Sequence, residues 1–264
     1  MSGIESNPIL EAQWGDTVTA MAEKYPGVAN SLMVMADVSA SMMGTPMEVS
    51  VTMALLMTAL GGSGGNFMTF DTTPRWVSVS PDMTLREKVR HIMASPWGGS
   101  TNVLGAMGLV LDVCKDNKFP EETVASLKLL IVSDMQFNAA TTMYSASPWA
   151  TTFEHIQCMF RNAGYSNPPI IVFWNVRATK GFPAPADVPG VIQLSGFSPH
   201  LLHVVMDGNL EELKKKTGDT ATSLDAMYSA LANPAYDRVR EACASVQEGR
   251  MAGYVPPPPV ENEK

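Results

Sequence analysis

Short apolar runs alternate along this chain with segments whose apolar residues recur at helical spacing. The apolar runs cover residues 31–39, 126–134, 169–176 and 190–196. The helical segments between and before them cover residues 44–60, 84–95, 100–117 and 149–164. Uninterrupted apolar runs of this length are typical of strands that are buried on both faces. Strands that alternate with amphipathic helices therefore predict a mostly parallel sheet with helices on both faces.

Two further short segments, 66–70 and 75–80, have the composition of strands and are joined by the turn-forming residues Asp-Thr-Thr-Pro. A connection this short cannot join parallel strands, so the pair reads as a hairpin. The sequence thus predicts a doubly wound α/β fold, mostly parallel, with one antiparallel edge strand.

We predict one domain over residues 31–247. Residues 1–30 are expected to form a polar lead-in with one amphipathic stretch, and residues 248–264 a proline-rich acidic tail with polyproline character. The chain has 264 residues, of which 45% are hydrophobic, so it can bury a sizeable core.

The net charge of −8 argues against direct nucleic-acid binding, because the one basic run, 214–216, directly follows two glutamates. No apolar run reaches the roughly 18–20 residues of a membrane span, and the start of the chain does not resemble a signal peptide. The three cysteines are widely spaced and form no disulfide or zinc pattern. We therefore expect a cytoplasmic protein without membrane contact.

Polar residues follow the buried strands at their carboxyl ends. Asp37, Ser39 and Ser41 leave the first strand, Asp134 leaves the second, and Thr101 lies in a glycine-rich turn that opens a helix. Ligands of doubly wound sheets bind at this edge. Two carboxylates and three hydroxyls are hard oxygen ligands, which suit Mg²⁺, Mn²⁺ or Ca²⁺.

Other interpretations of these residues remain open. Asp and Ser also favour simple turns and helix caps, which need no metal. An aspartate nucleophile with Mg²⁺ would make the chain a metal-dependent phosphoester hydrolase, but Ser39 stands where such an enzyme has a second acid. The hydrolase is therefore the weaker alternative.

The order and spacing of the three parts resemble the metal-ion-dependent adhesion site of von Willebrand factor A domains, which have a Rossmann-like fold. The resemblance implies that Ser39, Ser41 and Thr101 contact a Mg²⁺ ion directly, with Mn²⁺ or Ca²⁺ as substitutes. It implies that Asp37 and Asp134 bind the ion directly or through water. Such an ion accepts an Asp or Glu side chain from a partner protein.

The segments GGSTN, IVSDMQFN, GYSNPPIIVFWNVR and LSGFSPHLL resemble the C-terminal, A-domain-like part of an uncharacterised family related to the Ro/TROVE RNA-binding proteins. The resemblance makes a role in an RNA–protein assembly the first alternative function. The long helical region that usually precedes this domain in those proteins is not part of the match, so its RNA binding is not carried over.

Further residues are expected near the same edge and are candidates for contact with the partner. Asn175 and Arg177 leave the strand 169–176, Asp71 ends the strand 66–70, and Met42 and Met43 follow the Asp-x-Ser-x-Ser motif. Core filling for the methionines and an ordinary surface position for Arg177 are the alternatives. The function that we predict is non-enzymatic binding of an acidic side chain of a partner protein.

Overall fold

The computed structural model describes residues 7–69, 72–96, 102–135, 148–177, 190–196, 201 and 205–206. All of them belong to one compact unit, Met1–Ala226. The second unit, Met227–Lys264, and with it the predicted tail lie outside the described residues. No helix in the described ranges is both long enough and apolar enough to cross a bilayer.

The strands form one six-stranded sheet with the order β3-β2-β1-β4-β5-β6. Neighbouring strands run parallel except for β2 and β3, which form the antiparallel pair at one edge. The strands are β1 (Leu32–Ala36), β2 (Asn66–Thr69), β3 (Trp76–Ser78), β4 (Lys128–Ser133), β5 (Ile170–Asn175) and β6 (Val191–Ser195). The predicted doubly wound α/β fold with an antiparallel edge is confirmed.

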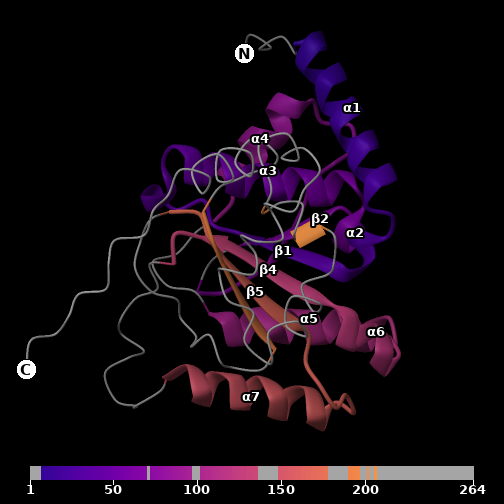
Figure 1. Ribbon diagram of the computed structural model, residues 1–264, viewed down its shortest axis with the longest axis vertical. Helices are drawn as coiled ribbons and strands as arrows, with labels where there is room; N and C mark the ends of the chain where they lie inside the picture. The colour runs from indigo at the N-terminus through magenta and orange to yellow at the C-terminus, as the bar shows by residue number, and fades with distance from the viewer. Residues whose placement is uncertain are drawn as a thin grey trace, which may run out of the picture. The chain divides into compact units, whose positions relative to one another are not determined.

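Helices cover both faces of this sheet (Figure 1). Helices α3 and α4 pack on one face, and α5 and α7 pack on the other. The helices are α1 (Pro8–Lys24), α2 (Val28–Ser31), α3 (Thr45–Ala59), α4 (Leu85–Met93), α5 (Val103–Asp116), α6 (Glu121–Ser126) and α7 (Pro148–Asn162), with 3₁₀ turns η1 (Ala40–Met42) and η2 (Gly62–Gly64).

Alternation along β1 divides its side chains between two hydrophobic cores. Val34 and Ala36 belong to the core that contains α3 and α4, whereas Met33 and Met35 belong to the core that contains α5 and α7. All five residues of β1 are buried. A strand in the middle of a sheet covered on both faces needs apolar side chains at every position, which explains the uninterrupted run in the sequence.

Local signals in the sequence explain where the helices begin and end. Thr84 and Glu87 form a reciprocal capping box at the start of α4. The helix α3 is followed by Gly61, whose φ of 82° lies in the left-handed region that favours glycine. These signals lie within two residues of the boundaries that the sequence predicts for the segments 84–95 and 44–60.

The predicted lead-in contains more structure than its polar sequence indicates. Helix α1 is capped by Asn7, and its residues Trp14, Val18 and Met21 pack against the core on the α3 side. The Glu11 carboxylate accepts a hydrogen bond of 2.8 Å from the backbone N–H of Leu85, the first residue of α4. Long-range packing and this bond hold α1, which has no buried residue of its own.

Candidate metal centre

The two predicted acids lie at the ends of adjacent central strands. From the β1–β4 pair the sheet extends to β2 and β3 on one side and to β5 and β6 on the other. This is the switch point of a doubly wound sheet, where the loops diverge and leave a crevice. Asp37 directly follows β1, and Asp134 directly follows β4. Segments almost 100 residues apart in the sequence are thereby brought to one place.

Asp37 is buried and is held by two hydrogen bonds. Its side chain is 1% exposed. The Ser133 hydroxyl donates a hydrogen bond of 2.7 Å to its Oδ2 atom, and the Ser39 backbone N–H donates one of 2.9 Å to its Oδ1 atom. Burial raises the pKa of Asp37 above its ordinary 3.8 and the charge of Asp134 adds to this rise, while the bonds from Ser133 and Ser39 oppose it. A nearby cation would favour the charged form of this carboxyl group.

The Asp-x-Ser-x-Ser segment folds so that its side chains converge. The bond from the Ser39 N–H to Asp37 closes an Asx turn two residues on, which is a typical use of Asp in a loop. A 3₁₀ turn, η1, follows and places the Ser39 and Ser41 Oγ atoms 3.0 Å apart. The Ser39 side chain also lowers the pKa of Asp37 through a hydrogen bond. The two hydroxyls therefore gather beside the first carboxylate, as the motif predicts.

Asp134 directly follows the last residue of β4. Its side chain is 1% exposed, and its charge raises the pKa of Asp37, so the two carboxyl groups are close in a setting with little water. The next residue, Met135, has a φ of 58°, an uncommon value for a residue other than glycine. This backbone lets the Met135 N–H donate a hydrogen bond of 3.1 Å to the Ser133 Oγ atom.

Ser133 is a residue of this centre that the sequence analysis missed. It is fully buried at the end of β4, donates to Asp37 and accepts from the Met135 N–H. Ser133 thus joins Asp37, directly after β1, to Met135, two residues after the end of Ser133's own strand β4. The signal in the sequence is a hydroxyl that interrupts an apolar strand directly before an acid.

Thr101 and Asp71 lie outside the described residues, so their predicted roles stay predictions. Their sequence neighbours are close together: the Asn102 side chain donates a hydrogen bond of 3.2 Å to the Thr72 carbonyl. Asn102 also caps α5 by accepting a bond of 2.8 Å from the Gly105 N–H. A Cβ atom at Gly105 would lie only 2.8 Å from the Asn102 amide nitrogen, so glycine leaves room for this cap.

The candidate partner-binding residues divide into exposed and buried ones. Met43 is 76% exposed, and Arg177 is exposed and donates a bond of 3.3 Å from Nη2 to the Met43 carbonyl. Met42 is fully buried in the core, so we correct its assignment to a partner surface. Asn175 is corrected as well, because it is 1% exposed and its Oδ1 atom accepts a bond of 3.0 Å from the Arg177 N–H.

A groove of about 420 Å³ begins at the Asp-x-Ser-x-Ser loop and runs between α3 and α4. Ala40 and Met43 line its end at the loop, and Met47, Val89 and Met93 are among the residues along it. Met43 and Met93 are two of the large apolar side chains that the described part of the chain exposes. Flexible methionine side chains can adapt to different apolar groups.

The donors at the switch point fit a hard divalent cation. Every candidate donor in the described part of this centre is an oxygen atom. The donors are the two buried carboxylates of Asp37 and Asp134 and the two hydroxyls of Ser39 and Ser41. The described residues contain no group of three or more His, Cys, Asp or Glu side chains that could hold a metal by themselves. Hydroxyls and water would complete the coordination, and Mg²⁺ usually retains several waters.

Residues 30–241 match the model of a family described as a domain of unknown function, DUF7788. The chain belongs to this family. The matched range starts just before β1, so the DUF7788 domain includes the whole sheet and both candidate acids.

The DUF7788 domain is also similar to two known proteins. It is 34% identical over 217 residues to the uncharacterised protein L728 of Acanthamoeba polyphaga mimivirus, covering 80% of this chain and 36% of that protein. A crystal structure of the Ro (RSR) protein of Deinococcus radiodurans superposes with a TM-score of 0.48 at 16% identity, covering 70% of this chain and 35% of the other. The chain thus spans about a third of each protein. The alternatives of an RNA–protein assembly and of a hydrolase stay predictions.

Proposed function

We propose that this chain is a non-enzymatic protein-binding module that captures an acidic side chain of a partner through a divalent cation. Asp37, Ser39, Ser41, Thr101 and Asp134 would hold the ion. The single observation that carries the proposal is the convergence of two buried carboxyl groups and two hydroxyls at the switch point of the sheet.

The electrostatics of the centre support a bound cation. Two buried carboxylates that lie close together repel each other, and here this repulsion adds to the cost of burying Asp37. A divalent ion between them would replace repulsion by attraction. The bond from Ser133 already holds Asp37 in one orientation, so the ion would bind to a carboxylate that needs little rearrangement.

Such an ion would still attract a further carboxylate. If the hydroxyls bind the ion directly and the two carboxylates, Asp37 and Asp134, bind it only through water, the ion keeps much of its positive charge. A carboxylate oxygen of a partner can then replace one water, because Mg²⁺ and Ca²⁺ prefer oxygen ligands. The residues of this chain would hold the ion in place while the partner's carboxylate replaces the water. They would provide no nucleophile or general base.

The surroundings indicate the chemistry of the partner. The exposed Arg177 guanidinium lies next to the Asp-x-Ser-x-Ser loop and would add a second positive charge beside the ion. The apolar groove starts at Ala40 and Met43 in the same loop. The partner that fits both is a segment with an acidic residue and a large apolar side chain close to it.

The proposal can be tested by selecting random displayed peptides on the full chain in Mg²⁺ and eluting them with a chelator. We expect the selected peptides to share an Asp or Glu and to lose binding when that residue is changed to Asn or Gln. Thr101→Ala should abolish binding, whereas Thr17→Ala, on the exposed side of α1, should leave it intact. Peptides that bind equally well after chelation, or that share no acid, would contradict the proposal.

A further inference from the structure

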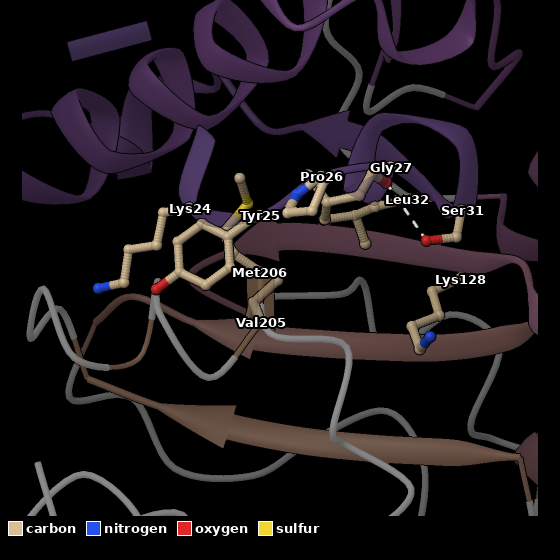
Figure 2. A pocket seen from close by; sticks show the side chains of 10 residues that line it. Lys24, Tyr25, Pro26, Gly27, Ser31, Leu32, Lys128, Val205 and Met206 are labelled. Atoms are coloured by element: carbon tan, nitrogen blue, oxygen red, sulfur yellow. Dashed lines mark hydrogen bonds between the residues drawn. The ribbon is translucent and has the colours of Figure 1, made fainter. Parts of the chain in front are cut away.

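A second pocket lies at the opposite end of the central strands from the candidate metal centre (Figure 2). Its lining includes Leu32 and Lys128, the first residues of β1 and β4, which are direct neighbours in the sheet. Its volume is about 250 Å³, which suits a small molecule. Because the carboxyl ends of these strands hold Asp37 and Asp134, the two sites share the same two strands at opposite ends.

Lys128 is an unusual residue at the start of a central strand. It is 8% exposed, and the hydrogen bond that its Nζ atom makes to the Ser126 carbonyl is 3.5 Å long, at the limit for such a bond. No carboxylate in the described part of the chain forms an ion pair with it. An ammonium group has three donors and is rarely buried without an anion. The bond to the Ser126 carbonyl, at the end of the short helix α6, therefore satisfies only part of the hydrogen-bonding capacity of the Lys128 ammonium group.

The remaining lining adds positive charge and hydroxyl groups but no acid. Lys24 and Tyr25 lie toward one end of the pocket, and Ser31 and Lys128 lie toward the other (Figure 2). The Lys24 ammonium is 5.2 Å from the centroid of the Tyr25 ring. The Ser31 hydroxyl donates to the Val28 carbonyl at 3.3 Å. The described lining therefore carries two positive charges and no negative one.

Apolar side chains provide the middle of the pocket. In the view of Figure 2, Val205 and Met206 lie between Lys24 and Lys128, and Leu32 is a further apolar residue of the lining. Val205 and Met206 are 1% and 2% exposed, so they belong to the core and only a small part of each borders the pocket. Small-molecule sites usually combine apolar side chains with a few fixed polar groups, and this lining contains both.

We propose that this pocket binds a small organic anion whose carboxylate or phosphate group pairs with Lys128 and whose apolar part packs against Val205 and Met206. The charge-assisted bonds that Lys128 can still donate would be made to the anion, since such bonds are stronger than those to a neutral carbonyl. Lys24, at the other end, attracts the same charge from solvent. The site is independent of the proposed metal centre.

The test is a calorimetric titration of the full chain with two probes, phenyl phosphate and benzoate, at constant ionic strength. Both carry an aromatic ring and differ in the anionic group. We expect binding of at least one probe with a dissociation constant below about 10 mM. Lys128→Met keeps the length and the apolar stem of the side chain and should weaken binding about tenfold or more, because a bond to a charged group is lost.

Control variants distinguish binding of the anionic probes in this pocket from their general attraction to lysine side chains on the surface. Lys115→Met removes an exposed charge on α5, away from the pocket, and should leave binding unchanged. Lys24→Met should weaken binding less than Lys128→Met, because Lys24 is exposed. Binding of one probe alone would identify the anionic group that the pocket prefers. Absence of binding by both probes, or equal binding by the wild type and Lys128→Met, would overturn the proposal.

Discussion

Replacing Ser133 by alanine tests how the candidate metal centre is held together. The Ser133 hydroxyl donates the 2.7 Å bond to the Asp37 Oδ2 atom and accepts the 3.1 Å bond from the Met135 N–H. Alanine fits the same space but can neither donate nor accept. The variant would leave one oxygen of a buried carboxyl group without its donor and one buried N–H without its acceptor.

The size of the effect follows from these two lost bonds. A hydrogen bond to a charged group contributes about 1.5–3 kcal/mol, and a buried polar group left unsatisfied costs a similar amount. The lost bond to Asp37 alone therefore predicts that Ser133→Ala lowers the free energy of unfolding by about 1.5–3 kcal/mol, and the lost acceptor of the Met135 N–H adds to this. For a unit of this size, 1 kcal/mol corresponds to about 2–4 °C in Tm, so the lost bond to Asp37 alone gives a fall of about 3–12 °C.

The assay is urea denaturation of the wild type, of Ser133→Ala and of Ser78→Ala, each with and without Mg²⁺. Ser78 is exposed on the edge strand β3, so its variant should match the wild type. Ser133→Ala should still respond to Mg²⁺, since Ser133 positions Asp37 and is not among the candidate ligands. A loss below about 0.5 kcal/mol, the ordinary range for surface changes, would refute the inference that this bond fixes the carboxylate.

Three further predictions concern other parts of the chain. Glu11→Ala should lower the free energy of unfolding by about 1 kcal/mol in urea denaturation, because the Leu85 N–H loses its acceptor, whereas Glu23→Ala on the exposed side of α1 should not. Bonds from the backbone N–H and the hydroxyl of Thr84 hold the pKa of Glu87 below its ordinary 4.5. The stability that Glu87 adds to α4 is therefore complete above pH 4.5 and is lost as the pH falls through the lowered pKa. Amide exchange in α4 should become faster over this range, and Glu87→Gln should remove the pH dependence. Burial raises the pKa of the Cys114 thiol to about 11, so a thiol reagent at neutral pH should modify the exposed Cys158 and leave Cys114 unmodified until the chain unfolds, as peptide mapping can show.

The sheet could be predicted from the sequence because every strand in its middle is buried on both faces. The runs that contain β1, β4 and β5 are apolar at each position or nearly so, which few other structures require. The edge pair was predicted from its short connection, which only antiparallel strands allow. The position of Asp37 and Asp134 then followed from the rule that polar residues gather at the carboxyl ends of such strands.

The finer features depend on the orientation of individual side chains, which the sequence does not specify. Met42 and Met43 are adjacent and chemically identical, yet the 3₁₀ turn η1 buries the first and exposes the second. Asn175 was a candidate for contact with the partner, but it is buried and accepts a hydrogen bond from the backbone N–H of Arg177. The helix α1 was not recognised as a packed helix because its contacts are made with α4 and the core, far along the chain.

The most direct test of the proposed metal centre is a calorimetric titration of the full chain with Mg²⁺, for the wild type and for Asp37→Asn. Asparagine keeps the shape of the side chain and can accept the bond from the Ser39 N–H, so the variant should fold. We expect one Mg²⁺ ion to bind the wild type and none to bind the variant, and Mg²⁺ at about 100 times its dissociation constant to stabilise only the wild type, by about 2.7 kcal/mol. Equal Mg²⁺ binding by both proteins, or no binding of Mg²⁺, Mn²⁺ or Ca²⁺ by the wild type, would contradict the assignment of Asp37 and Asp134 to a metal centre.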